Sequence, residues 1–452
     1  MHRTTPHTSR LLWLMLAVAL WAAPNARAAT LLAVTDLHFD PFADARVAPL
    51  LAHTPAEGWA DVLAAGSPAL PGYGDPGTQP LLDGLVLGMR AAAGSHRQPD
   101  AILCTGDLLA HDFADRARAV PGVESDADVR EMILKTVEYV ALRLAGAFPG
   151  VPVYLSLGNN DAFAGDYALV DGGAFLARTA PLLARLLPPG VERQAARGAW
   201  TRHGCYAADV PGGVTIVSLA GVFLSARRED GTSAARQLDF LERQLQRARL
   251  RGRRVWLLTH IPPGVDVFGT LHARDGDAAG PHLFLRPEAN RRLNALLREG
   301  ADVLALTLTG HTHMEDFRLQ GAAEGPAESV LHIVPAVSPV FNQNPAFRVF
   351  TTDDAGRLAD AVTHVLDLET PNDGWRPGPG LRAADGPVLA DGPDASGLAA
   401  LWRAMPDDAA LRETYTLRYS TRREPPLMHG HWREFRCGVA ASDAEAYAAC
   451  LR

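Results

Sequence analysis

Side chains that can bind metal ions follow five apolar segments of the chain, each at the point where the segment ends. The side chains are those of Asp36, Asp107, Asn159, His260 and His311, and the apolar segments before them span 31–35, 101–105, 151–157, 255–259 and 303–309. A single residue of this kind is ordinary, because Asp caps helices and Gly-Asn pairs form turns. Five in succession, each after a similar segment, predict one shared site.

The spacing of these residues adds two more candidate ligands. Asp36 and His38 lie two residues apart, as do His311 and His313, so each pair can reach one ion where a strand gives way to a loop. The carboxylate of Asp107 can bridge two cations. Mixed His, Asp and Asn ligands suit Zn, Mn or Fe rather than Ca or Cu(I). We therefore predict two divalent metal ions held by seven residues, which are Asp36, His38, Asp107, Asn159, His260, His311 and His313.

The elements that must position these residues alternate along the chain. The five apolar segments are short, as expected for strands buried on both faces. Helical patterns lie between them, near 80–94, 126–147, 173–187, 233–250 and 286–298. Further strands are predicted at 201–209 and 213–219, joined as a hairpin, and at 328–334, 346–352 and 358–366, where they would complete a second sheet. Alternation of this kind predicts an α/β layered fold, which places its ligands at the carboxyl ends of strands.

The first 28 residues are typical of an export signal. Arg3 and Arg10 precede an apolar run from 11 to 23, and residues 26–28 read A-R-A, an A-x-A cleavage site. The run is short for a bilayer-spanning helix, although a retained membrane anchor is the alternative. We predict a secreted or periplasmic protein without stable membrane insertion. The net charge of −8 argues against a nucleic-acid partner, which favours basic proteins.

Composition divides the rest of the chain. Residues 29–366 contain every metal-capable strand end and form the predicted catalytic domain. Within it, residues 40–80 are rich in Pro, Gly and Ala and are predicted as a surface insertion. Residues 367–452 are predicted as a linker, up to about 395, and a helical C-terminal subdomain that packs back on the main domain.

The four cysteines fit an oxidising compartment. Cys437 and Cys450 flank a short segment and can close it as a disulfide. Cys104 and Cys205 lie in strand-like segments, and we expect no bridge between them.

Together these motifs resemble the calcineurin-like metallophosphoesterase superfamily, whose sequence blocks run D-x-H, G-D, G-N-H, H and G-H-x-H. All five blocks occur here in that order, but the third reads G-N-N-D over residues 158–161. Residues 105–112, T-G-D-L-L-A-H-D, are similar to the block T-G-D-x-x-x-H-D of the acid sphingomyelinase-like phosphodiesterases. Residues 259–264, 310–317 and 344–350 resemble later blocks of that branch. The G-N-N-D variant also resembles endopolyphosphatase-like members.

The resemblance implies a four-layer α-β-β-α sandwich with two mixed sheets, followed by the small helical C-terminal subdomain. It also implies the ligand sets of the two ions. One ion would be held by Asp36, His38, Asp107 and His313, and the other by Asp107, Asn159, His260 and His311. The two ions would lower the pKa of a shared water, and the resulting hydroxide would attack phosphorus.

The predicted catalytic residues are His111, Asn159 and Asn160. In many relatives the His of the G-N-H block lies near the proton source for the leaving group, but Asn160 cannot do acid–base work. His111 matches a family histidine near the metal site and becomes the candidate proton source. The alternative is that His111 orients a metal ligand. Asp161 is a candidate for orienting Asn159 or His111.

These features predict a hydrolase that cleaves phosphodiester or phosphoanhydride bonds of a small phosphorylated substrate outside the cytoplasm. A phosphomonoesterase or polyphosphatase on the same fold is one alternative. A non-catalytic metal-binding protein is another, and Asn160 is the one residue that favours it. The export signal and the acidic charge argue against a nuclease.

Overall fold

The computed structural model describes residues 28–66, 69–94, 98–273, 280–322, 325–389, 392–423, 428 and 430–452. The predicted export signal therefore lies outside the described residues, apart from Ala28. Within the described ranges, no helix is long and apolar enough to cross a membrane.

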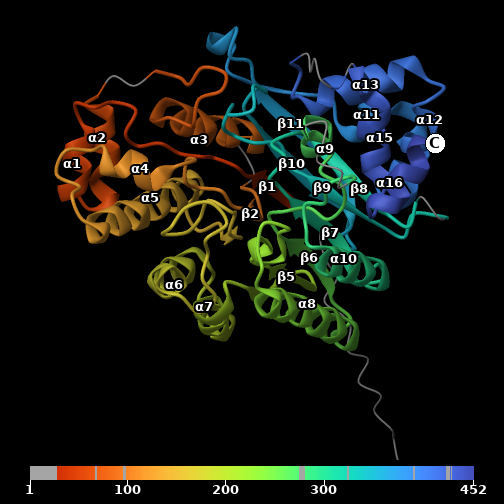
Figure 1. Ribbon diagram of the computed structural model, residues 1–452, viewed down its shortest axis with the longest axis horizontal. Coiled ribbons are helices and arrows are strands. Elements are labelled where there is room, and N and C mark those ends of the chain that lie inside the picture. The colour runs from red at the N-terminus through yellow and green to blue at the C-terminus, as the bar shows by residue number, and fades with distance from the viewer. Residues whose placement is uncertain are drawn as a thin grey trace, which may run out of the picture.

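Two six-stranded mixed sheets form the centre of the molecule (Figure 1). The strand order is β12-β11-β10-β1-β2-β3 in the first sheet and β4-β5-β6-β7-β9-β8 in the second. The strands that precede the candidate ligands are β1 (Thr30–Val34), β2 (Ala101–Cys104), β3 (Val153–Leu155), β6 (Arg254–Leu258) and β7 (Leu304–Thr309). Within each sheet these strands run parallel, so their carboxyl ends share one edge. The other strands are β4 (Tyr206–Val210), β5 (Val214–Ser218), β8 (Asp316–Gln320), β9 (Ser329–Ile333), β10 (Ala346–Thr352), β11 (Leu358–Leu366) and β12 (Trp375–Pro377).

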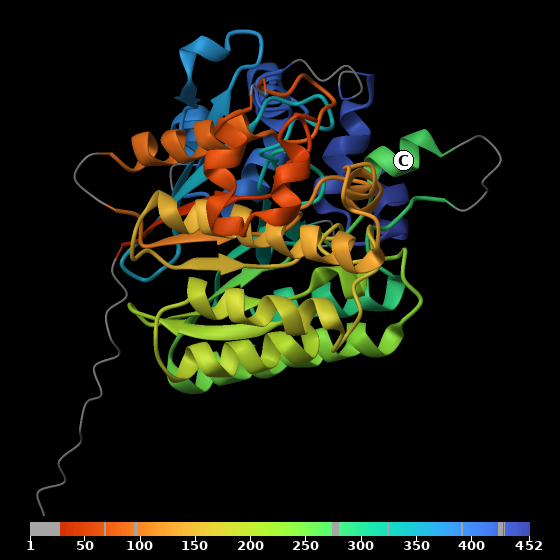
Figure 2. The same ribbon diagram turned by 90° about the vertical axis from the view of Figure 1, so that its left-hand side faces the viewer.

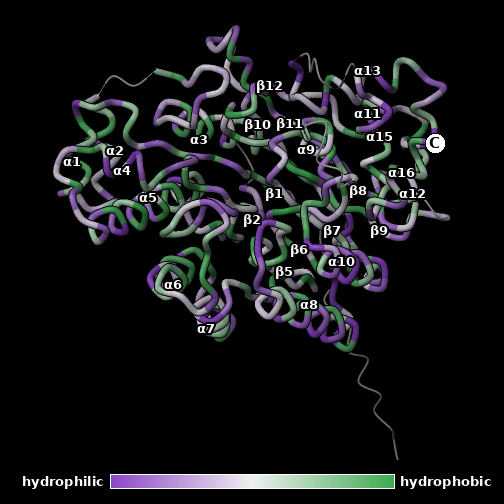
Figure 3. Tube along the Cα trace, in the orientation of Figure 1, coloured by the Kyte–Doolittle hydropathy of each residue, from purple (hydrophilic) through white to green (hydrophobic). Residues whose placement is uncertain are grey.

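Helices cover the outer face of each sheet and complete the predicted α-β-β-α layers (Figure 2). The outer helices are α3 (Gln79–Ala93) and α5 (Asp126–Ala147) for the first sheet, and α8 (Gly231–Arg251) and α10 (Pro287–Glu299) for the second. Figure 3 shows that α8 and α10 are largely hydrophilic. Their apolar residues recur at helical spacing, as in Leu238, Leu241 and Leu245, and form a core against the second sheet. The α/β sandwich prediction is confirmed.

Several elements differ from the sequence prediction. The predicted strand 201–209 begins only at Tyr206, because α7 (Val191–His203) continues to a left-handed glycine cap at Gly204. The segment 40–80 forms α1 (Ala48–His53) and α2 (Trp59–Ala64), and Trp59 is fully buried, so this insertion contributes to the core. The strands β8 and β12 were not predicted.

The C-terminal helices pack against the second sheet, as predicted. They are α12 (Ala395–Ala404), α13 (Ala409–Tyr419), α15 (Trp432–Ala440) and α16 (Ala444–Leu451). The hydroxyl of Tyr415 in α13 donates to Asp316 of β8 at 2.8 Å. Before these helices, β12 pairs with β11, so part of the segment 367–395 belongs to the first sheet. The remaining helices are α4 (Phe113–Arg118), α6 (Ala174–Leu186), α9 (Val267–His272) and α11 (Leu381–Ala384).

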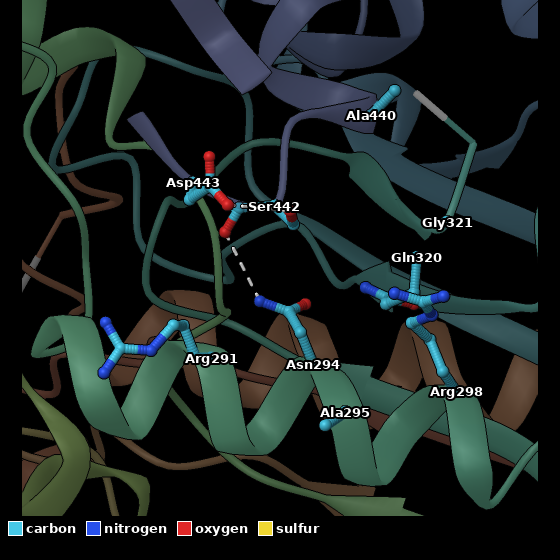
Figure 4. Close-up of a pocket in the computed structure, with 9 residues that line it drawn as sticks. All are labelled: Arg291, Asn294, Ala295, Arg298, Gln320, Gly321, Ala440, Ser442 and Asp443. Carbon is cyan, nitrogen blue, oxygen red and sulfur yellow. Dashed lines mark hydrogen bonds between the residues drawn. The ribbon is translucent and has the colours of Figure 1, made fainter. Parts of the chain in front are cut away.

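A cavity of about 170 Å³ lies between α10 and the turn that joins α15 to α16 (Figure 4). Arg291 and Arg298 of α10 line one side, and Ser442 lines the other. Asn290 and Asn294 donate to the carbonyl oxygen of Ser442 at 2.6 and 3.4 Å, and so attach the turn to α10. This cavity does not contain any of the seven candidate ligands.

The predicted disulfide between Cys437 and Cys450 is present and joins α15 to α16, while Cys104 and Cys205 are free and buried. The bridge closes a loop over a sequence separation of 13. We expect the double variant Cys437→Ser/Cys450→Ser to lose roughly 3 kcal/mol of stability, because the unfolded chain regains the loop-closure entropy. Thermal unfolding with and without dithiothreitol tests this. The reductant should lower the midpoint of the wild type and leave the variant unchanged; an equal fall in both would contradict the prediction.

Candidate metal centre

The structure brings together all seven predicted ligand side chains at the carboxyl ends of β1, β2, β3, β6 and β7, where the two sheets meet. Asp36, His38 and His260 are fully buried, and the others except His311 are nearly so. Backbone hydrogen bonds hold the strand ends side by side. The amide of Asp36 donates to Gly106 at 2.9 Å, and the amide of Gly310 donates to His260 at 2.9 Å.

One half of the site contains Asp36, His38 and His313. The Nε2 atoms of the two histidines face each other at 3.1 Å. Oδ1 of Asp36 lies 3.8 Å from Nε2 of His38 and 3.4 Å from Nε2 of His313, and it is buried without a hydrogen-bond partner. Buried polar atoms in proteins normally have partners. A cation is the group that would satisfy two facing imidazole nitrogens and an orphaned carboxylate oxygen together.

The other half contains Asn159, His260 and His311. Oδ1 of Asn159 lies 3.1 Å from Nε2 of His260 and 2.9 Å from Nδ1 of His311. Asp107 lies between the halves, with Oδ2 3.3 Å from Nε2 of His260 and 3.6 Å from Nε2 of His38. Two adjoining sets of donors with one shared carboxylate fit a pair of ions better than a single ion.

Backbone carbonyls orient two of the histidines. Nδ1 of His38 donates to the carbonyl of Leu109 at 3.0 Å, and Nδ1 of His260 donates to the carbonyl of Thr105 at 3.0 Å. With the proton on Nδ1, the Nε2 atom of each ring faces the site, and it becomes a metal ligand once it has lost its own proton.

The electrostatics of the donor set are those of carboxylates facing imidazoles. Burial opposes ionisation of Asp36, but His313 and His260 hold its pKa well below the usual range, and His260 does the same for Asp107. Burial disfavours a charged His260, but Asp107 and Asp36 raise its pKa to about 9. Burial and His260 lower the pKa of His311 to about 3, and burial lowers that of His313 well below its usual value. The carboxylates stay ionised and His311 and His313 stay neutral, as metal ligands must be.

Left-handed backbone conformations are concentrated at this site. Five candidate ligands have positive φ angles, namely Asp36 (48°), His38 (40°), Asp107 (54°), His311 (74°) and His313 (64°). Residues other than glycine rarely adopt this region, and such strain gathers at functional sites. Gly158 and Gly310 have no Cβ, and this allows their backbones to lie close to Asp107 and Thr35. A Cβ on Gly158 would lie 2.0 Å from Oδ1 of Asp107, and one on Gly310 would lie 2.2 Å from Oγ1 of Thr35.

Asp161 does not orient Asn159 or His111, which corrects that prediction. Its fully buried carboxylate accepts hydrogen bonds from the backbone amides of Asp107, Leu108 and Gly158, each at 2.9 Å. It therefore fixes the two loops that carry Asp107 and Asn159. Burial and the neighbouring Asp107 raise the pKa of Asp161 to about 6.

Asn160 holds the shared carboxylate. Its amide N–H donates to Oδ1 of Asp107 and its side-chain Nδ2 donates to Oδ2, both at 2.8 Å. Asp166, which sequence reasoning missed, accepts from Nδ2 of Asn159 at 2.5 Å and so turns the carbonyl oxygen of Asn159 toward the two histidines. No motif in the sequence marked Asp166.

His111 lies beside the first half of the site. Its ring stacks on His38 with a centroid distance of 4.3 Å, and its Nε2 is buried without a hydrogen-bond partner. One of its ring nitrogens also lies within 4.8 Å of donor atoms of His38 and His313, so His111 is a candidate for a metal-binding group that sequence reasoning had not included. Burial and the neighbouring His38 lower the pKa of His111 to about 4.

Aromatic side chains surround the donors. Phe284 packs edge-on against His311 at 5.6 Å, Phe341 packs edge-on against His313 at 4.5 Å, and the hydroxyl of Tyr167 lies 3.5 Å from Nε2 of His311. A four-layer α/β sandwich with buried aspartate and histidine donors at its strand ends is the arrangement of a metal-dependent phosphoesterase.

The chain belongs to the calcineurin-like phosphoesterase family, whose model matches residues 29–315. Within the family it is related to the acid sphingomyelinase-like phosphodiesterases. It is 24% identical to acid sphingomyelinase-like phosphodiesterase 3b of Homo sapiens, over 80% of this chain and 76% of that protein. It is 23% identical to a cyclic GMP-AMP phosphodiesterase of Homo sapiens, over 62% of this chain and 58% of that protein. The predicted resemblance is confirmed, and the protein is a metal-dependent phosphoric ester hydrolase.

Proposed function

We propose that this protein is an exported enzyme that uses two divalent metal ions to hydrolyse phosphodiester bonds of a small phosphorylated substrate. The observation that carries the proposal is the pair of adjoining donor sets, in which an orphaned Asp36 oxygen faces His38 and His313 and Asp107 reaches both sets. The predicted export signal and the disulfide support a secreted or periplasmic location.

We assign the ligands of each ion as the family resemblance implies. Asp36, His38, Asp107 and His313 would hold one ion, and Asp107, Asn159, His260 and His311 would hold the other. Zn, Mn and Fe all suit such nitrogen and oxygen donors. When bound, such ions polarise the phosphoryl oxygens and supply a nucleophilic water at neutral pH.

The protein's own residues prepare this site. Asn160 holds both oxygens of Asp107, and Asp166 fixes the orientation of the Asn159 amide. Phe284 and Phe341 pack edge-on against the rings of His311 and His313. Removing such supporting groups typically costs 10- to 100-fold in metal affinity or activity, so we regard Asn160 and Asp166 as positioning residues.

A diester substrate is favoured over a monoester by the relatives, two of which are named as phosphodiesterases. We expect the purified protein, supplied with Mn or Zn, to turn over bis-p-nitrophenyl phosphate faster than p-nitrophenyl phosphate. Release of p-nitrophenol measures both reactions. A strong preference for the monoester would overturn the diesterase assignment, and a protein that binds metal but turns over neither ester would favour a non-catalytic metal-binding protein.

His111 is the proposed donor to the leaving group. Its lowered pKa leaves the ring neutral at pH 7, so the ring would act as a hydrogen-bond donor through a neutral N–H rather than as an imidazolium. We expect His111→Ala to slow diesters with alkyl leaving groups more than bis-p-nitrophenyl phosphate, because p-nitrophenolate needs little proton assistance. Steady-state kinetics on both substrates measure this, and metal analysis serves as the control. An equal loss on both, with lost metal, would make His111 a metal ligand instead.

A further inference from the structure

An arginine lies at the edge of the metal centre, outside the donor sets. Arg227 is in the segment between the short 3-10 helix Gly221–Leu224 and α8, and its side chain is exposed. Its guanidinium carbon lies 5.2 Å from the centroid of the Tyr167 ring. The hydroxyl of Tyr167 in turn lies 3.5 Å from Nε2 of His311. A short chain of contacts therefore connects Arg227 to the site.

The backbone of Tyr167 is held in an unfavourable conformation at this position. Its φ angle is 56°, which is a rare value for a bulky residue. The amide of Tyr167 donates to the carbonyl of Asn159 at 2.8 Å, and the carbonyl of Tyr167 accepts from the guanidinium of Arg228. Strain of this kind persists only where surrounding contacts impose it, and it marks functional positions.

Arg227 has no ion pair among the described residues, although two carboxylates are near enough to influence it. Asp166 is engaged by Asn159, and Asp266 caps α9 by accepting from the amide of Gly269 at 2.8 Å. The distances of 5.2 Å from its guanidinium carbon to the Tyr167 ring and of 3.5 Å from the Tyr167 hydroxyl to His311 place the guanidinium close to the metal centre. An unpaired guanidinium is well suited to bidentate phosphate binding, since its planar donors match the phosphate oxygens.

We propose that Arg227, positioned on the ring of Tyr167, binds a second phosphate of the substrate next to the one that is hydrolysed. This inference rests on the proposed phosphoesterase function and narrows the substrate to molecules with two neighbouring phosphate groups. The Tyr167 hydroxyl completes the subsite as a donor, because Nε2 of His311 can donate to the phenol oxygen and leave the phenol proton free.

Arg291 provides a matched control. It is also an exposed arginine without an ion pair among the described residues, and it lines the cavity of Figure 4, away from the candidate ligands. Arg291→Gln makes the same chemical change as Arg227→Gln. It also tests whether the cavity, rather than the edge of the metal centre, is the anion site.

The test compares two non-hydrolysable probes, methylenediphosphonate with two phosphonates and methylphosphonate with one. Calorimetric titration of the metal-loaded protein gives both dissociation constants, with metal content checked before and after. We define the diphosphonate advantage as the dissociation constant of methylphosphonate divided by that of methylenediphosphonate. We expect Arg227→Gln to reduce this advantage about tenfold, since one charge-assisted contact is lost. Arg227→Lys should keep part of it, and Arg291→Gln should keep all of it.

An unchanged advantage in Arg227→Gln, or a loss in Arg291→Gln, would overturn the proposal. The absence of any advantage in the wild type would also overturn it. Turnover of bis-p-nitrophenyl phosphate by the wild type is measured separately, because this substrate has one phosphate. Failure of that reaction with an intact diphosphonate advantage would reject the proposed function and leave the second-phosphate site standing.

Discussion

The variant Asp107→Asn is expected to lose about a thousandfold or more in turnover of bis-p-nitrophenyl phosphate while keeping its fold. The carboxylate of Asp107 lies between the two donor sets and is the only side chain among the described ligands assigned to both. An amide at this position removes the negative charge. Its NH2 group would also face either the amide N–H or the Nδ2 donor of Asn160, both of which now donate to Asp107.

Metal analysis should show that Asp107→Asn binds less metal than the wild type, and far-ultraviolet circular dichroism should show an unchanged fold. Asp115→Asn is the matched control, since it makes the same change at an exposed carboxylate that pairs with Arg118. We expect the control to retain full activity and metal. Near-normal turnover by Asp107→Asn would remove the two-metal assignment.

Asp161→Asn should lower both the stability and the activity of the protein. The buried carboxylate accepts three backbone amides at 2.9 Å from two different loops. An asparagine presents one acceptor oxygen and one donor group, so at least one of these amides would face an N–H group. Buried amide donors that lose a carboxylate acceptor lower the free energy of unfolding by about 2–4 kcal/mol. We also expect turnover to fall about 10- to 100-fold, because the loops that carry Asp107 and Asn159 lose their common anchor.

Urea denaturation of the metal-free protein measures the stability change without the contribution of bound ions. Asp166→Asn is the control here, because Asp166 accepts a single side-chain amide. This control should lose activity but less than about 1 kcal/mol of stability. If Asp161→Asn unfolded at the same urea concentration as the wild type, the anchoring role of Asp161 would be wrong.

The sequence by itself determined the strands that precede the ligands, the order of the ligands and the layered fold. Each ligand follows a short apolar run, and the side chains of buried parallel strands leave that local signature. Because open α/β sheets gather the carboxyl ends of their strands, the convergence of Asp36, His38 and Asp107 with the distant histidines followed from pattern alone. His38 and His313 meet although they are 275 residues apart.

Only the tertiary structure decided how the ligands are supported. Asp161 and Asp166 stand in the same short segment of the sequence, yet one anchors backbone amides and the other turns an Asn159 side chain. Tyr167 reaches His311, and Arg227 reaches Tyr167, through loops that have no periodic signal in the sequence. The signal of these strands is a short continuous apolar run within the chain itself, whereas these contacts depend on how the loops of two separate sheets are brought together.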